Sequence, residues 1–163
     1  MEKLTAGIEL AGTTLHLFCG PATANTNYKG GGVTAVPGIV PFDDAASYVA
    51  CVIDTGITVT RTSDSGNLTT SCDSVTAINA TGTVEYVGTN NTSTYKLDTI
   101  TAVSLFGQRG GLACGTVTGG MFAGANVCEL FIRASDQIAN CITPGGSVTR
   151  SSGANYLLIY STA

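Results

Sequence analysis

The chain has 163 residues, enough for one domain, and glycine, serine and threonine fill 58 of its positions. Charged residues make up only 11%, tryptophan is absent and the formal net charge is −4. These values argue against a disordered chain and, because the seven lysines and arginines are scattered, against a nucleic-acid partner.

The first predicted elements are two strands, at residues 4–9 and 13–19. In the second, Leu15, Leu17 and Cys19 fall on one face of an extended chain. This alternation has the period of two that is typical of a half-buried strand.

The next two segments predict irregular and helical structure. Residues 20–41 are rich in glycine, proline and asparagine, which indicates a long loop or arm. Residues 43–48 predict a short helical turn, because Asp43 and Asp44 are residues whose side chains accept a hydrogen bond from a free amide at a helix start.

The rest of the chain predicts short strands separated by turns. The strand candidates are residues 48–54, 57–62, 74–78, 83–87, 95–100, 102–106, 115–118, 126–133 and 156–161. The turn signals are residues 64–67, 80–82, 90–91, 109–111, 119–120 and 144–146, all rich in glycine, asparagine or proline.

Many short strands without helical periodicity predict an all-β fold: a β-sandwich or a jelly-roll-like barrel of short antiparallel strands, with long loops and at most one short helix. Residues 1–163 show no internal repeat and no boundary, so we expect a single β domain. Such a domain must protect its sheet edges, and joining identical subunits is one way to do so. A homo-oligomer is therefore expected, with a trimer as the candidate form.

The six cysteines leave two alternatives open. Cys51 and Cys128 lie within apolar strand patterns and predict buried thiols, whereas the other four lie at strand ends or turns, where bridges form more easily: Cys19, Cys72, Cys114 and Cys141. No secretory signal follows Met1, which favours free thiols. At least one disulfide is the alternative, and the sequence does not choose among the pairings.

The sharpest candidate for chemistry is the tripeptide Asp54-Thr55-Gly56, which follows an apolar pair. Aspartic proteases carry such a tripeptide on a loop after a strand, and residues 105–107 resemble the strand that braces this loop in retroviral-type enzymes. However, Ile57 stands where those enzymes have a small residue. A hairpin turn with Gly56 in the left-handed region is therefore the favoured interpretation, and the protease using Asp54 is the distant alternative.

No other pattern predicts catalytic, cofactor-binding or metal-ligating residues. His16 has no partner at a suggestive spacing and is interpreted as a partly exposed strand residue, and the acidic residues do not form a calcium loop. The acceptor patterns at Asn67, Asn79, Asn90 and Asn91 are interpreted as unused. No apolar run is long enough for a membrane span, so no membrane partner is expected.

The chain resembles tailed-bacteriophage virion proteins of the head decoration or tail-tube type. The resemblance lies in a start without an export signal, in residues 4–7 and 11–15, and in the closing apolar strand 154–160. It implies a non-enzymatic capsid decoration or cement protein, made in the host cytoplasm and located in the virion, with the major capsid protein as partner. The alternative is a tail-tube or another self-assembling extracellular filament subunit.

Overall fold

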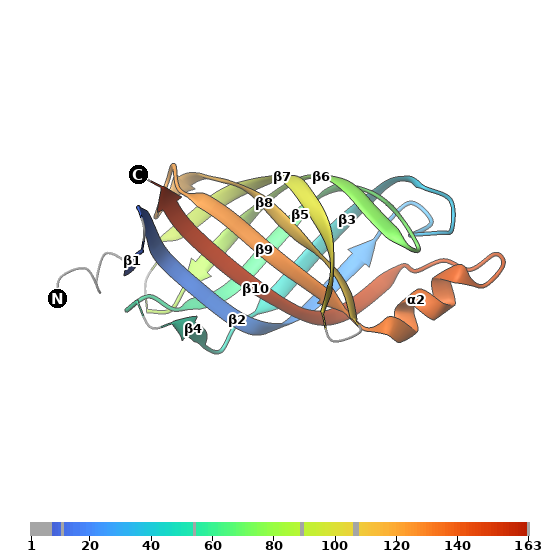
Figure 1. Cartoon of the computed structure of the whole chain (residues 1–163), viewed down its shortest axis with the longest axis horizontal. Coiled ribbons are helices and arrows are strands. Elements are labelled where there is room, and N and C mark those ends of the chain that lie inside the picture. The colour runs from blue at the N-terminus through green and yellow to red at the C-terminus, as the bar shows by residue number, and fades with distance from the viewer. Residues whose placement is uncertain (1–7, 11, 54, 89, 106–107, 163) are drawn as a thin grey trace.

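The structure is a computed structural model that describes residues 8–10, 12–53, 55–88, 90–105 and 108–162. These residues form one antiparallel sheet and one short helix (Figure 1). The strands are β1 (Ile8–Leu10), β2 (Thr13–Tyr28), β3 (Gly38–Ser47), β4 (Cys51–Ile53), β5 (Val59–Ser71), β6 (Ser74–Tyr86), β7 (Thr92–Leu105), β8 (Gln108–Gly120), β9 (Asn126–Arg133) and β10 (Arg150–Thr162), and the helix is α2 (Ser135–Ile142).

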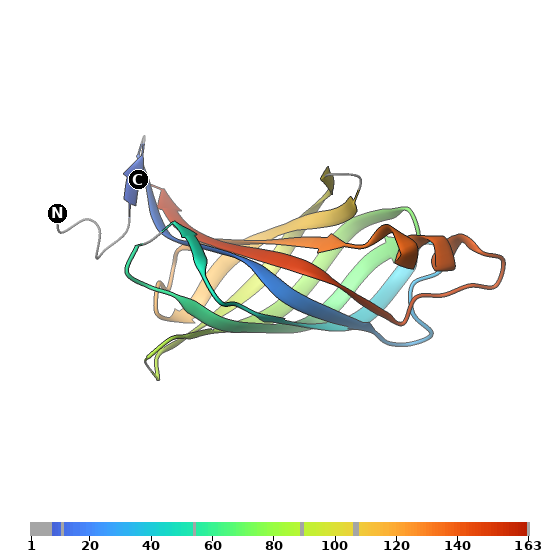
Figure 2. The same cartoon turned by 90° about the horizontal axis from the view of Figure 1, so that it is seen from below.

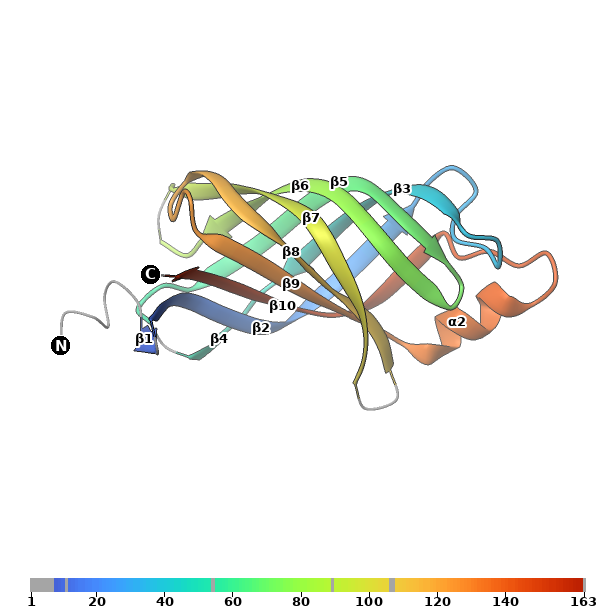
Figure 3. The same ribbon diagram turned by 45° about the horizontal axis from the view of Figure 1, so that its top comes forward.

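Eight of the strands close into a barrel. They follow one another in the order β2, β10, β9, β8, β7, β6, β5 and β3, and β3 pairs back to β2. Figure 3 shows this ring from the side, with α2 at the end of the barrel opposite β1 and β4. The predicted all-β fold is therefore confirmed in the form of a closed antiparallel barrel.

The strands are longer than the sequence pattern predicts, and the expected arm at residues 20–41 is wrong in its extent. β2 runs on to Tyr28 and β3 begins at Gly38, so only residues 29–37 connect the two strands. The continuation of β2 places Ala22 and Ala24 in the barrel interior. Backbone hydrogen bonds to strands on both sides outweigh the weak strand preference of its glycine, proline and asparagine residues.

The helical turn expected at residues 43–48 is also wrong. Asp43 and Asp44 lie within β3, which pairs with β2 on one side and β5 on the other. The turns expected at residues 64–67, 80–82 and 109–111 lie inside β5, β6 and β8. The expected left-handed conformation of Gly56 is confirmed, with a φ of 86°.

The barrel interior changes character along its axis, as β9 illustrates. Val127 belongs to an apolar end of the core, the next inward residue Glu129 is polar and fully buried, and the one after it, Phe131, packs at the other end. A buried polar layer therefore lies between two apolar ends. The helix α2 lies at the end of the barrel away from β4 (Figure 2).

All six cysteines form disulfides. Cys19–Cys51 joins β2 to β4, Cys114–Cys128 joins β8 to β9, and Cys72–Cys141 joins the turn between β5 and β6 to α2. The prediction of free thiols is wrong, and so is the interpretation of Cys51 and Cys128 as unpaired core residues. Cys114 and Cys128 are register partners with Cα atoms 4.1 Å apart, so pairing of the strands brings the two thiols together.

Candidate functional site

A cavity of about 190 Å³ lies inside the barrel at the end where α2 is found. Most of its wall is apolar and comes from strands β3, β5, β6, β7 and β9: Phe42, Leu68, Val75, Ile78, Ile100 and Phe131. Its polar lining includes Thr26, Tyr28, Arg133 and Ser151. An apolar enclosure with a few grouped polar side chains is the usual form of a small-molecule site.

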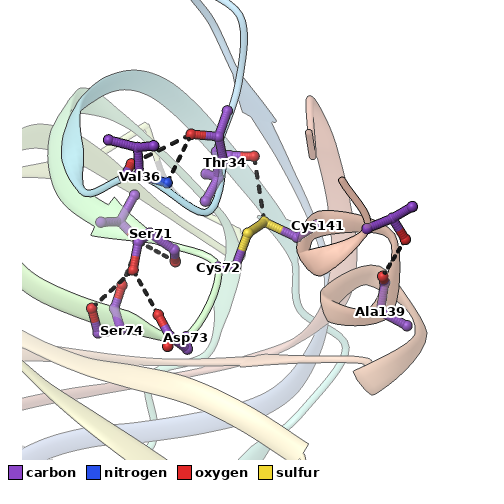
Figure 4. Close-up of a disulfide and its surroundings, with 11 residues drawn as sticks. Thr34, Val36, Ser71, Cys72, Asp73, Ser74, Ala139 and Cys141 are labelled. Carbon is purple, nitrogen blue, oxygen red and sulfur yellow. Dashed lines mark hydrogen bonds between the residues drawn. A yellow bond between two sulfur atoms is a disulfide. The ribbon is translucent and has the colours of Figure 1, made fainter. Parts of the chain in front are cut away.

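A disulfide lies at the rim of this cavity. Cys72 and Cys141 both line the cavity, and their bond ties α2 to the turn between β5 and β6 (Figure 4). The Cys141 Sγ also lies 3.4 Å from the carbonyl oxygen of Val33, in the connection between β2 and β3. Three segments that are far apart in the sequence therefore meet at the rim.

A buried polar cluster lies next to the cavity. It contains the carboxyl groups of Asp44, Asp64 and Glu129, which contribute oxygen atoms within 4.8 Å of one another. These residues are 3%, 5% and 0% exposed. The cluster touches the cavity through Arg133 and Thr26, which line the cavity and also hydrogen-bond to Asp44.

One phenol joins two of these carboxyl groups. The Tyr95 hydroxyl lies 2.9 Å from Oδ2 of Asp64 and 2.6 Å from Oε1 of Glu129. Its single proton serves one acceptor at a time, so the second short contact needs a proton on a carboxyl group. A protonated Glu129 that donates to the Tyr95 oxygen, while Tyr95 donates to Asp64, satisfies all three groups.

The electrostatics of the pair agree with this arrangement. Burial raises the pKa of Asp64 to about 6, and burial and the neighbouring Asp64 raise the pKa of Glu129 well above its usual value. Two acidic groups that share a low-dielectric site cannot both ionise cheaply. Burial also raises the pKa of Tyr95, so the phenol stays a hydrogen-bond donor.

The fold makes room for this phenol at a glycine. Gly82 lies on β6 between Asp64 on β5 and Tyr95 on β7, and is the register partner of both. A Cβ atom at Gly82 would lie 2.5 Å from the Tyr95 hydroxyl and 2.7 Å from Cβ of Asp64. The glycine that the sequence marks as a turn therefore serves close packing inside the barrel.

Arg133 compensates the charge of the third carboxyl group. Its NH2 group donates to Asp44 Oδ1 at 2.9 Å and to Thr26 at 2.7 Å, while its NH1 group donates to Asn155 Oδ1 at 3.1 Å. Asn155 in turn donates to Asp44 at 2.8 Å and to Glu129 at 3.3 Å. Together with Tyr95, Arg133 and Asn155 therefore connect the three carboxyl groups through hydrogen bonds.

Three carboxyl groups are a plausible ligand set for a hard cation, but protein donors already occupy this set. Five of the six carboxyl oxygens lie within hydrogen-bond distance of Arg133, Thr26, Asn155 or Tyr95. Oδ1 of Asp64 is the one oxygen without a partner among the described residues. The geometry therefore favours a proton-sharing network over a metal centre.

The residues singled out from the sequence lie elsewhere. His16 is half-buried at the opposite end of the barrel, where its ring stacks on Phe122 at 4.8 Å and its Nε2 lies 2.8 Å from the Ser161 hydroxyl. Asp54, the candidate of the protease alternative, lies outside the described residues, as do residues 106–107. Thr55 beside it is buried and donates to the His16 carbonyl.

Sequence reasoning missed every member of the buried cluster. Asp44 was interpreted as a helix cap, because aspartate accepts hydrogen bonds at helix starts, and Asp64 as a turn residue, because serine, glycine and asparagine follow it. Glu129 could have been recognised from the sequence, because it lies two residues from both Val127 and Phe131 and so falls on the same inward face of a largely apolar strand. A charged residue at such a position indicates a partner inside the barrel.

Comparison of the chain with family models, with curated proteins and with solved structures finds no match. Among the described residues, no helix has the length and apolar character that a membrane crossing requires.

Proposed function

We propose that this protein binds a small, largely apolar molecule inside its barrel. The observation that carries the proposal is the cavity of about 190 Å³ with apolar walls and one polar side. An apolar cavity of roughly 150 Å³ is large enough to hold benzene, so this space suits a single-ring or short-chain molecule.

The disulfides support the same function. A ligand-binding barrel needs a rigid wall, and the three bonds fasten β2 to β4, β8 to β9 and α2 to the rim. Disulfides persist in oxidising surroundings, which supports an extracellular place of action. The buried network beside the cavity adds rigidity, since its members are held by several hydrogen bonds each.

The virion role, with its homo-oligomeric assembly and capsid partner, stays a prediction. The eight barrel strands pair in a closed ring and leave no free edge within that ring. The need to protect sheet edges therefore gives no reason for these strands to join identical subunits. The tail-tube, filament and protease alternatives likewise stay predictions.

A cavity-filling variant tests the proposal. We expect wild-type protein to bind toluene in ligand-detected NMR or calorimetry, and Val75→Trp to weaken that binding at least about ten-fold, because Val75 lines the cavity. Val87→Trp is the matched control, since Val87 is 60% exposed and does not line the cavity. Equal toluene binding by both variants, or none by the wild type, would contradict the proposal.

A further inference from the structure

We infer that the ligand is uncharged and carries one hydrogen-bond acceptor oxygen. This inference rests on the proposed function and specifies the chemistry of the molecule that the cavity takes. Three properties of the described lining residues support it: neither arginine is free to pair with a buried anion, none of these residues is a buried acid, and two of them carry hydroxyl groups that contact each other.

An anionic ligand is disfavoured because neither lining arginine offers a buried, unpaired guanidinium: Arg109 is exposed to solvent, and Arg133 is already occupied. Its terminal NH1 and NH2 groups donate to Asp44, Thr26, Asn155 and two backbone carbonyls. Its Nε–H is enclosed and has no acceptor among the described residues. A carboxylate binds an arginine best through two parallel N–H groups, and Arg133 has no such pair left to offer.

A cationic ligand is disfavoured by the charges that face the cavity. Among the residues that the structure describes, the lining contains Arg109 and Arg133, and Asp73 is its one acidic residue. Asp73 lies exposed in the rim turn and accepts a hydrogen bond from Ser71. The ring of Phe131 lies 5.7 Å from the Arg133 guanidinium, so a cation bound to this ring would meet another cation. Burying an unpaired charge in such a site is strongly unfavourable, because the charge loses its hydration and gains no partner.

An acceptor oxygen on the ligand finds a donor at the polar side of the cavity. The hydroxyl groups of Tyr28 and Ser151 both belong to lining residues and lie 3.0 Å apart. One of them donates to the other, so the hydroxyl that accepts keeps its own hydrogen for a third partner. A carbonyl or ether oxygen fits this position, because it accepts and brings no charge.

Isosteric probes test the charge. We would measure dissociation constants of acetophenone, benzoate and benzylammonium at pH 7, with toluene as the reference hydrocarbon. Acetophenone is expected to bind at least about ten-fold more tightly than either ion. Binding of benzoate or benzylammonium as tight as that of acetophenone would overturn the inference while leaving the proposed function intact. If toluene and all three probes fail to bind, the proposed function fails and this inference fails with it.

A double variant tests the acceptor. Tyr28→Phe combined with Ser151→Ala removes both hydroxyl groups and keeps the ring. Acetophenone is expected to lose about three- to ten-fold in affinity, the range of one neutral hydrogen bond, whereas toluene changes by less than about two-fold. Unchanged acetophenone affinity together with unchanged toluene affinity would overturn the assignment of the acceptor to this hydroxyl pair.

Discussion

Asp64 and Glu129 share the Tyr95 hydroxyl, which lies 2.9 Å from one carboxyl group and 2.6 Å from the other. They come from strands that lie on opposite arcs of the barrel, β5 and β9, and neither belongs to the other's hydrogen-bonded ladder. Their contact through Tyr95 therefore ties the two halves of the barrel together. It also makes the stability of the fold depend on a proton.

The first prediction concerns pH. The pKa of Asp64 is raised from 3.8 to about 6 in the folded chain, and the pKa of Glu129 is raised well above its usual value. Because the unfolded chain releases these protons first, the stability that protonation provides is complete below pH 4 and is lost as the pH rises through 6. For Asp64 alone the loss is about 3 kcal/mol. Urea denaturation at pH 4.5 and 7.5 should show about 2 kcal/mol of this loss, because the remainder falls below pH 4.5.

Other ionisable groups near Asp64 and Glu129 do not reverse the predicted loss of stability with rising pH. Asp44 is paired with Arg133 at 2.9 Å, and Tyr48 and Tyr95 have raised pKa values that keep them neutral in this range. The hydrogen bond from Asn27 lowers the pKa of Asp43, so the contribution of Asp43 changes only below pH 4. Equal or greater stability at pH 7.5 would contradict the shared proton.

The second prediction isolates Glu129. Glu129→Gln keeps the shape and a donor of the protonated acid and removes the cost of protonating it at pH 7.5, so we expect the free energy of unfolding at that pH to stay equal or to rise by about 1–3 kcal/mol. Asp98→Asn is the control, because the Asp98 side chain is 53% exposed and its ion pair with Lys96 contributes little. A large destabilisation by Glu129→Gln alone would show that the glutamate is ionised in the fold.

The third prediction concerns the buried ion pair. Arg133→Met leaves the Asp44 carboxylate without its cation and is expected to lower the free energy of unfolding by about 3–5 kcal/mol. Adding Asp44→Asn to Arg133→Met removes the uncompensated charge and should recover part of that loss. A double-mutant cycle of chemical denaturation measures the coupling, and additive effects would contradict a direct pair.

The fourth prediction concerns Gly82. Gly82→Ala places a Cβ atom 2.5 Å from Tyr95 and 2.7 Å from Asp64 Cβ, so the strands or the phenol must move. We expect a loss of stability of about 2–4 kcal/mol. Gly38→Ala is the matched control, because nothing lies within 4 Å of its Cβ position, and it should change stability by less than about 0.5 kcal/mol. Thermal unfolding of both variants checks the difference.

The fifth prediction concerns the disulfide at the cavity mouth. Cys72 and Cys141 are 69 residues apart and Cys114 and Cys128 are 14 apart, so replacing each pair by alanine should cost about 4 and about 3 kcal/mol, respectively. The Cys72→Ala/Cys141→Ala variant also frees α2 from the rim. Toluene should therefore dissociate faster from it than from the Cys114→Ala/Cys128→Ala control, as measured by exchange-sensitive NMR. Identical exchange rates would show that the tether does not control access.

The amino-acid sequence by itself determined the class of the fold. Alternation of period two, as at Leu15, Leu17 and Cys19, and scarce helix-forming charges are local properties, and they predicted an all-β domain correctly. The turn at residues 144–146 and the left-handed Gly56 followed from glycine and proline chemistry alone.

Only the tertiary structure decided the strand lengths, the disulfides and the site. Gly82 looks like a turn residue in sequence, yet pairing with strands on both sides keeps its backbone extended. Asp44, Asp64 and Glu129 are 20 or more positions apart and share no motif, so their meeting depends on the register that closes the barrel. Local conformational preferences are worth tenths of a kcal/mol per residue. Strand pairing around the closed barrel and burial of its interior act on every strand at once, so they outweigh these preferences.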